Sequence, residues 1–276
     1  MRLEVSRRLM AATTATALLL AAGCATAPPR TTSSSPSPPQ PGNLPDAVPR
    51  TEPRSSHGNP PFYDVNGQRY KVLASADNFV ERGVASWYGP DFHGHNTSSG
   101  ERYDMYGMTA AHKTLPIPCY VRVTNLANGR SIVVRINDRG PFVAHRIVDL
   151  SYSAATRLDI VRTGTAFVEL RTVGPAANNP VDRSPTMPPE PALPMIPVPA
   201  ALYIQVGAFA DSGNAQRIID RLQSAGVPHV FSLANTTGER VLRRVRVGPI
   251  ATVEEFDRLA TQLATLGFPE ARLANE

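Results

Sequence analysis

Alternating hydrophobic and polar residues dominate 82–173 and predict β-strands there. β-Branched and aromatic side chains recur at every second position in four runs, 83–88, 120–125, 131–137 and 166–173. Asn128-Gly129 lies between two of these runs and predicts a hairpin. Only 151–158 has a helical pattern, with Ser151 as its N-cap. About 90 residues of short strands with one helix predict a small β-barrel.

The pattern changes in 201–276, which contains an internal repeat. Val206-Gly207-Ala208-Phe209 corresponds to Val247-Gly248-Pro249-Ile250, and Gly226-Val227-Pro228 corresponds at the same offset to Gly267-Phe268-Pro269. Each half holds apolar residues at helical spacing between its two motifs, which predicts an amphipathic helix. With a strand at 229–236, the order is βαββαβ, the split-βαβ arrangement of an α+β domain.

Two helices on one side of this sheet leave its other face free to bind a ligand. Alternation turns Ile204 toward the helices and Tyr203 and Gln205 outward, and on the paired strand Arg246 shares the outward face. An aromatic ring, an amide and a cation suit a sugar chain with acidic groups. The alternative is an ordinary solvated sheet face.

Proline-rich stretches separate the folded parts. Most of the 27 prolines lie in 28–61 and 175–199, where proline excludes regular helix and central strand because it lacks an N–H donor and fixes φ. We therefore expect a Pro/Ser-rich tether over 24–61 and a Pro-rich linker over 174–200. Before the barrel, 62–81 contains Asn66-Gly67 between apolar runs, which predicts a type I′ hairpin.

Residues 1–23 have the pattern of a secretory signal peptide. Arg2, Arg7 and Arg8 form a basic start, an apolar stretch too short to span a membrane follows, and small residues precede Cys24. This pattern resembles a bacterial lipobox, so we expect lipidation of Cys24 and anchoring in a membrane. The alternative is an ordinary cleaved signal with a chance cysteine. Ala25 favours the periplasmic face of the outer membrane over the inner membrane.

Charge and cysteine content exclude several classes of function. The formal net charge is +5, and an exported chain with one modestly basic domain is a poor partner for nucleic acid. The 2 cysteines exclude a disulfide framework and a cysteine-based zinc cluster. His93 and His95, with His112 as a third ligand, are an alternative zinc site. Two histidines in a glycine-rich loop are a weak signal, and we expect no metal and no other cofactor.

Three residues of the predicted barrel are candidates for acid–base chemistry. Asp138 ends an apolar strand inside the polar cluster Asn137-Asp138-Arg139, and a plain turn before Gly140-Pro141 is the alternative. Glu101 lies in a loop, where most glutamates are simply exposed. His112 precedes an apolar run and fits a hydrogen-bonded core histidine as well as a catalytic one.

A series of motifs across the barrel resembles the rare lipoprotein A family. In chain order the motifs are Gly83-Val84-Ala85-Ser86-Trp87-Tyr88-Gly89, Phe92-His93-Gly94, Thr97, Gly100-Glu101, Thr109-Ala110-Ala111-His112, Leu115-Pro116, Val121-Arg122-Val123-Thr124-Asn125, Asn128-Gly129-Arg130, Val134-Arg135-Ile136-Asn137-Asp138-Arg139-Gly140-Pro141 and Asp149-Leu150-Ser151. The C-terminal repeat resembles the SPOR domain, whose members bind peptidoglycan. The resemblance implies a multi-domain chain: an all-β six-stranded double-psi β-barrel over 82–173, then a ribonucleoprotein-like SPOR domain over 201–276.

The same resemblance implies a lyase. Members of the family are endolytic lytic transglycosylases that cleave the MurNAc–GlcNAc bond of peptidoglycan and leave 1,6-anhydro-MurNAc ends. It also implies a preference for denuded glycan strands, which lack stem peptides, and enrichment at the division septum; the sequence identifies no divisome partner. A non-catalytic glycan-binding lipoprotein with an expansin-like barrel is the alternative.

Roles of single residues follow from this resemblance. Asp138 aligns with the essential aspartate of the family and is expected to act as acid and base, and Glu101 and His112 fall on the other proposed catalytic positions. The residues expected to contact the substrate are Ser86, Trp87, Tyr88, Thr97, Asn137 and Arg139 in the barrel, and Tyr203, Gln205 and Arg246 in the SPOR domain. A lytic enzyme uses the C6 hydroxyl of the sugar as nucleophile and needs one carboxyl group, whereas a hydrolase needs two.

Overall fold

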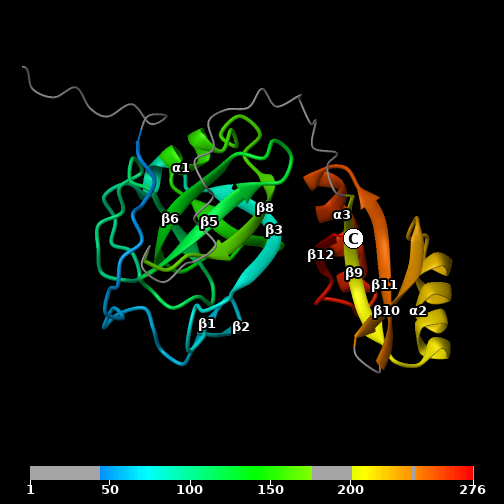
Figure 1. The fold of residues 1–276 in the computed structure, drawn as a ribbon. Coiled ribbons are helices and arrows are strands. Elements are labelled where there is room, and N and C mark those ends of the chain that lie inside the picture. Colours follow the sequence, from blue (N-terminus) through cyan, green and yellow to red (C-terminus); the bar gives the residue numbers. More distant parts are fainter. Residues whose placement is uncertain (1–43, 176–200, 238–239, 276) are drawn as a thin grey trace, which may run out of the picture. The chain divides into compact units, whose positions relative to one another are not determined.

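The structure, a computed structural model, describes residues 44–175, 201–237 and 240–275. Six strands of the first part form a closed barrel in the order β3-β7-β4-β6-β5-β8 (Figure 1). Their bounds are Val80–Trp87 (β3), Thr109–His112 (β4), Cys119–Asn125 (β5), Ser131–Asp138 (β6), Arg146–Leu150 (β7) and Ala166–Thr172 (β8). The six-stranded double-psi barrel expected from the sequence is therefore present. Within the described residues no helix is both long and apolar enough to cross a membrane.

The barrel is stabilised by apolar side chains that alternate along the strands and point inward. Six of them, two each from β5, β6 and β8, are completely buried: Val121, Val123, Val134, Ile136, Val168 and Leu170. Removing this apolar surface from water is the main source of barrel stability. The four strands predicted from alternation correspond to β3, β5, β6 and β8.

Two barrel strands, β4 and β7, were not predicted from the sequence. β4 has only four residues, Thr-Ala-Ala-His, and Thr109 is the one β-branched side chain among them, which is too weak a signal for a strand. β4 pairs in parallel with β6, and β7 pairs in parallel with β3. The parallel pairs join segments far apart in sequence, which a local pattern does not report.

Local capping and turn signals were confirmed. Helix α1, Tyr152–Arg157, begins after Ser151, whose side chain accepts a hydrogen bond from the backbone N–H of Ala154. Strands β5 and β6 form the hairpin expected around Asn128-Gly129. Strands β1 (Phe62–Val65) and β2 (Gln68–Lys71) form the hairpin expected before the barrel, and both turn residues have positive φ, 52° at Asn66 and 77° at Gly67.

Residues 44–61, which we call the strap, lie against the barrel and differ from the free tether that their prolines suggested. The backbone N–H of Ala47 donates to the carbonyl of Val133 at 3.0 Å, and that of Ser55 donates to Ile117 at 3.0 Å. Asp46 accepts from the backbone N–H of Val133 at 3.1 Å. Proline removes a donor but does not prevent an extended segment from pairing through its other residues.

The C-terminal part has the βαββαβ order expected from the sequence. Its elements are β9 (Leu202–Phe209), α2 (Ser212–Ser224), β10 (Val230–Thr237), β11 (Arg240–Ile250), α3 (Val253–Thr265) and β12 (Arg272–Asn275). The sheet is antiparallel with the order β10-β11-β9-β12. Helix α2 is capped by Asp211 and α3 by Thr252, which accepts from the backbone N–H of Glu255.

The two faces of this sheet differ as alternation requires. One row of paired residues across all four strands is apolar and buried, and consists of Val230, Val247, Ile204 and Leu273. The adjacent row, on the opposite face, consists of Phe231, Arg246, Gln205 and Arg272. The second row defines the helix-free face.

Candidate functional site

Asp138 lies at the end of β6, and its carboxyl group is held by several hydrogen bonds. One oxygen accepts from the backbone N–H of Ser98 at 2.8 Å, from the Ser98 hydroxyl at 2.7 Å and from the backbone N–H of Arg139 at 2.7 Å. The other oxygen accepts from the Tyr88 hydroxyl at 3.1 Å. These donors fix the orientation of the carboxyl group at the end of β6.

Ser98 is held in place by a tight turn. The backbone N–H of Thr97 donates to the carbonyl of Glu101 at 2.7 Å, and that of Gly100 donates back to Thr97 at 2.9 Å. Gly100 has φ of 90°, a conformation that glycine adopts without strain. Thr97, which is buried, also bonds the hydroxyl of Ser99 at 2.9 Å. Thr97 therefore shapes the turn that presents Ser98 to Asp138.

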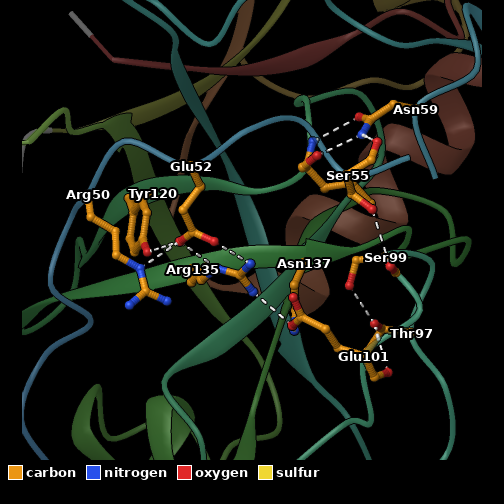
Figure 2. A network of polar contacts seen from close by, with 11 residues as sticks. Arg50, Glu52, Ser55, Asn59, Thr97, Ser99, Glu101, Tyr120, Arg135 and Asn137 are labelled. Atoms are coloured by element: carbon orange, nitrogen blue, oxygen red, sulfur yellow. Dashed lines mark hydrogen bonds and ion pairs between the residues drawn. The ribbon is translucent and has the colours of Figure 1, made fainter. Parts of the chain in front are cut away.

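Glu101 belongs to a polar network that crosses the outside of the barrel (Figure 2). Its carboxylate accepts from Arg135 Nη1 at 2.8 Å and from Asn137 Nδ2 at 2.9 Å. Partial burial alone would raise the pKa of Glu101, but the hydrogen bonds from Arg135 and Asn137 outweigh it, so this pKa lies below its usual value. Glu101 is therefore ionised at neutral pH and is an acceptor rather than a proton donor.

The network continues into the strap. Arg135 also binds Glu52, with Nη2 at 2.8 Å and Nε at 3.0 Å, and the Tyr120 hydroxyl donates to the same carboxylate (Figure 2). The hydrogen bond from Arg135 is the main reason that the pKa of Glu52 falls to about 2. One guanidinium thus joins the strap to Glu101 at the edge of the candidate site.

His112 does not meet Asp138 or Glu101 among the side-chain contacts of the described residues. Its ring is buried, Nε2 lies 3.0 Å from a carboxylate oxygen of Glu81, and Nδ1 accepts from the backbone N–H groups of Thr114 and Leu115. Because Nδ1 accepts, Nε2 carries the proton and donates it toward Glu81. His112 thus hydrogen-bonds to Glu81, a carboxylate that the sequence had not indicated.

The guanidinium of Arg139 is used by the protein framework. It is buried, and it donates to the carbonyls of Gly58 at 2.8 Å and His112 at 3.1 Å and to the Asn59 side chain at 3.1 Å. These hydrogen bonds tie the strap and β4 to the end of β6, and the contact of Arg139 with substrate stays a prediction. Burial lowers the pKa of Arg139, although the group stays charged.

Asp149 is a carboxyl group at the site that the sequence analysis did not single out. Ser86 pairs with Asp149, Asp149 with Ala111, and Ala111 with Asp138, which places both aspartates on one row across β3, β7, β4 and β6. The Ser86 hydroxyl donates to Asp149. Burial raises the pKa of Asp149, while the hydrogen bond from Ser86 acts in the opposite direction. Asp149 lies in one of the family motifs, but only the sheet register brings it onto the row of Asp138.

Aromatic residues surround this row. Tyr88 packs against Tyr103 with ring centroids 4.9 Å apart and against Phe92 at 5.7 Å. Burial raises the pKa of Tyr88, and the nearby charge of Asp138 adds to the effect, so its hydroxyl remains a donor. Trp87 packs on Tyr152 at 5.6 Å and on the barrel core. Tyr88 therefore reaches Asp138 directly, whereas Trp87 contributes mainly to packing.

His93, which the sequence offered as a zinc ligand, contacts other groups of the protein. His93 Nδ1 accepts from the backbone N–H of Met105 at 3.2 Å and lies 3.9 Å from Asp104. In the part of the chain that the structure describes, no three His, Cys, Asp or Glu side chains are grouped as metal ligands would be. Cys24 lies outside the described residues.

On the C-terminal sheet, two of the residues expected to face outward are covered. Tyr203 and Arg246 are buried, whereas Gln205 is half-buried and Arg272 is exposed. The guanidinium of Arg246 lies 5.8 Å from the centroid of the Tyr203 ring, and Tyr203 meets Phe231 edge to face at 5.4 Å. Among the described residues, Nε and Nη1 of Arg246 have no hydrogen-bond partner. The contact with the Tyr203 ring stabilises this buried charge in part.

Known protein families match both folded parts of the chain. Residues 80–170 match the family described as lytic transglycolase, and 199–272 match the SPOR domain. The chain is 38% identical over 273 residues to the endolytic peptidoglycan transglycosylase RlpA of Pseudomonas aeruginosa, covering 82% of this chain and 80% of the relative. The RlpA of Neisseria meningitidis serogroup A is 46% identical over 214 residues, covering 76% of this chain and 81% of the relative.

A solved structure, the crystal structure of the RlpA SPOR domain from Pseudomonas aeruginosa, is 29% identical with a TM-score of 0.26, and covers 27% of this chain and 99% of that one. The chain belongs to the RlpA family of endolytic peptidoglycan transglycosylases.

Proposed function

We propose that this protein is a lytic transglycosylase that cleaves the glycan strands of peptidoglycan at internal bonds. Family membership supports the reaction class. The observation that carries the assignment of the site is the fixed carboxyl group of Asp138, with donors from Ser98 and Arg139 on one oxygen and Tyr88 on the other. We assign the bond between MurNAc and GlcNAc as the one cleaved.

In the proposed reaction Asp138 is both acid and base. Its proton goes to the glycosidic oxygen as the bond from C1 of MurNAc to that oxygen breaks. The C6 hydroxyl of the same MurNAc then forms a bond to C1 and returns its proton to Asp138. The product is a 1,6-anhydro ring, no water is consumed, and the carboxyl group ends in its starting state.

The neighbouring groups receive supporting roles. Glu101 is ionised and bound to Asn137, so we assign it to accept a hydrogen bond from the sugar or to polarise Asn137. His112 and Arg139 are positioning residues, because the His112 carbonyl accepts from Arg139, whose backbone N–H donates to Asp138. Burial raises the pKa of Asp149 whereas the pKa of Glu101 is lowered, so Asp149 keeps its proton to higher pH than Glu101 does.

We further propose that the C-terminal domain binds glycan strands without stem peptides. Gln205 and Arg272 are accessible on the helix-free face, beside the stacked pair Arg246 and Tyr203. The guanidinium of Arg246 is buried beside the Tyr203 ring and contributes a positive charge to this face. Such a domain would direct the enzyme to the division septum, where denuded strands arise.

Anchoring is a separate proposal. Lipidation of Cys24 would hold the protein at a membrane, and Ala25 favours the outer one. We expect Cys24→Ser to move the protein from the membrane fraction to the soluble periplasmic fraction. A mature chain whose Cys24 thiol still reacts with an alkylating reagent would show that no lipid is attached.

The decisive experiment is digestion of purified denuded strands by wild-type and Asp138→Asn protein, with mass spectrometry of the products. Wild type should give ends lighter by one water than hydrolysis products, and Asp138→Asn should lower kcat by at least about 10³-fold without loss of fold. Asp159→Asn is the matched control, because Asp159 is exposed with φ of 62°, which asparagine tolerates. Binding without cleavage by wild type would instead favour the non-catalytic glycan-binding protein.

A further inference from the structure

A small aromatic surface lies beside the barrel, contributed mainly by residues outside the two family matches. Tyr63 of β1 and Tyr70 of β2 stack with ring centroids 5.2 Å apart and planes 24° apart. Phe142, which follows the loop of Asp138, meets Tyr63 at 6.2 Å and Tyr70 at 5.7 Å. We call these three side chains the hairpin shelf. The hairpin precedes residue 80, where the barrel match begins.

The shelf is firmly attached to the barrel. The Tyr63 hydroxyl donates to the carbonyl of Lys113 at 2.7 Å, and the guanidinium of Arg139 lies 5.9 Å from the Tyr63 ring centroid. Burial raises the pKa of Tyr63 to about 12, so the ring is neutral throughout the physiological range. Phe142 remains 37% exposed. The shelf is thus attached to the barrel through Tyr63 and open to solvent at Phe142.

The shelf adjoins the candidate catalytic carboxyl. A cavity of about 380 Å³ is lined by Tyr63 and Phe142 together with Ser98 and Arg139. Ser98 donates two hydrogen bonds to Asp138, so one residue borders both the cavity and the carboxyl group. A volume of this size lies within the range of small-molecule sites. A polymer that passes Asp138 can therefore reach the shelf without leaving the surface.

We propose that the hairpin shelf is a further sugar-binding subsite of the barrel, which binds the glycan strand at a ring beyond the cleaved bond. The inference rests on the proposed cleavage of glycan strands. Aromatic faces stack on the C–H faces of sugar rings, and the guanidinium of Arg139 is already committed to protein acceptors, which leaves stacking as the main interaction. Among the residues that line this cavity, no cation is free to pair with an anionic ligand.

The test compares Phe142→Ala and Tyr70→Ala with wild type, using the full-length protein on long denuded strands and on short oligosaccharides. Loss of one stacking contact should raise KM on long strands about 3- to 10-fold and leave kcat nearly unchanged. Short oligosaccharides that end before the shelf should show no difference. Phe62→Ala is the matched control, because Phe62 is 52% exposed and pairs with Lys71 on the other face of the same hairpin.

Two outcomes would overturn the inference. Unchanged KM on long strands for both shelf variants, at an unchanged melting temperature, would remove the subsite while leaving the proposed function intact. Equal KM increases for long and short substrates would show a general effect on the site rather than a distant ring. Failure of wild type to cleave any strand would contradict the proposed function itself; binding of long strands to the shelf variants then tests the subsite separately.

Discussion

Ser98 supplies two of the donors that hold Asp138, one from its backbone and one from its side chain. The backbone donor survives any substitution other than proline, so Ser98→Ala removes only the hydroxyl. A hydrogen bond to a charged group contributes about 1.5–3 kcal/mol. We expect Ser98→Ala to lower kcat by about 10- to 100-fold with little change in KM, measured as steady-state cleavage of denuded strands. A larger change in KM than in kcat would assign Ser98 to substrate binding instead.

The Ser86–Asp149 contact gives a test based on pH. The Ser86 hydroxyl favours the ionised form of Asp149, so Ser86→Ala should raise the already elevated pKa of Asp149 further. If the protonated form of Asp149 takes part, the alkaline limb of the pH–kcat profile moves to higher pH in Ser86→Ala. Thr163→Ala, a hydroxyl removed from a loop after α1, is the control. An unmoved limb in Ser86→Ala, with activity retained in Asp149→Asn, would leave Asp149 a structural role only.

At the level of residues, the sequence indicated the acids but not their surroundings. Asp138 and Glu101 were singled out, and the structure places them on adjacent parts of the wall, linked through Asn137 and the 97–101 turn. Ser98 and Asp149 were missed, because a backbone N–H has no sequence signature and the row that brings Asp149 near Asp138 depends on strand register. The burial of the Arg139 side chain likewise depends on the strap, and no local sequence pattern predicts where the strap lies.

At the level of elements, the strap makes a testable contribution to barrel stability. Glu52 has a pKa of about 2 in the folded protein against an ordinary value of 4.5, so the stabilisation it provides is present above about pH 4.5 and is lost as the pH falls toward 2. Glu52→Gln should lower the free energy of unfolding by about 1–3 kcal/mol at neutral pH. It should also flatten the pH dependence of stability between pH 4.5 and 2.

Chemical denaturation at several pH values measures this effect, and Asp64→Asn is the control. Asp64 forms an ion pair with Arg69 at 2.9 Å, but both groups are exposed, so solvent screens the interaction. We expect no measurable loss in Asp64→Asn. Equal destabilisation by the two substitutions would show that the strap pair contributes no more than an exposed one.

Elements with strong local signals were predicted and those that depend on distant partners were not. The hairpin at Asn66-Gly67 and the caps at Ser151 and Thr252 follow from short-range chemistry, and all are present. β4 lacks such a signal because its alanines are buried by neighbours from elsewhere in the chain. The strap was assigned to the tether on composition, although composition does not exclude docking.

At the level of the whole molecule, the barrel and the C-terminal domain are expected to act as separable modules. The isolated 201–276 domain should co-sediment with amidase-treated sacculi, and Gln205→Ala combined with Arg246→Ala should weaken this binding at least about 10-fold. Glu254→Ala, on the exposed first turn of α3, is the control. Deletion of the domain should reduce septal localisation of the protein more than it reduces cleavage of soluble strands. Wild-type binding by the double variant would exclude the helix-free face.

If Cys24 is lipidated as proposed, the docking of the strap also limits how far the barrel can lie from the membrane. A fully extended chain spans at most about 3.3–3.6 Å per residue. With Cys24 as the anchor, a tether that ended at the hairpin would reach about 130 Å, whereas one that ends where the strap begins, at Leu44, reaches about 70 Å. With such an anchor, holding 44–61 against the barrel through contacts such as Glu52 to Arg135 would roughly halve the greatest distance between the membrane and the barrel. Strap variants would therefore widen the zone of cleavage as well as weaken the fold.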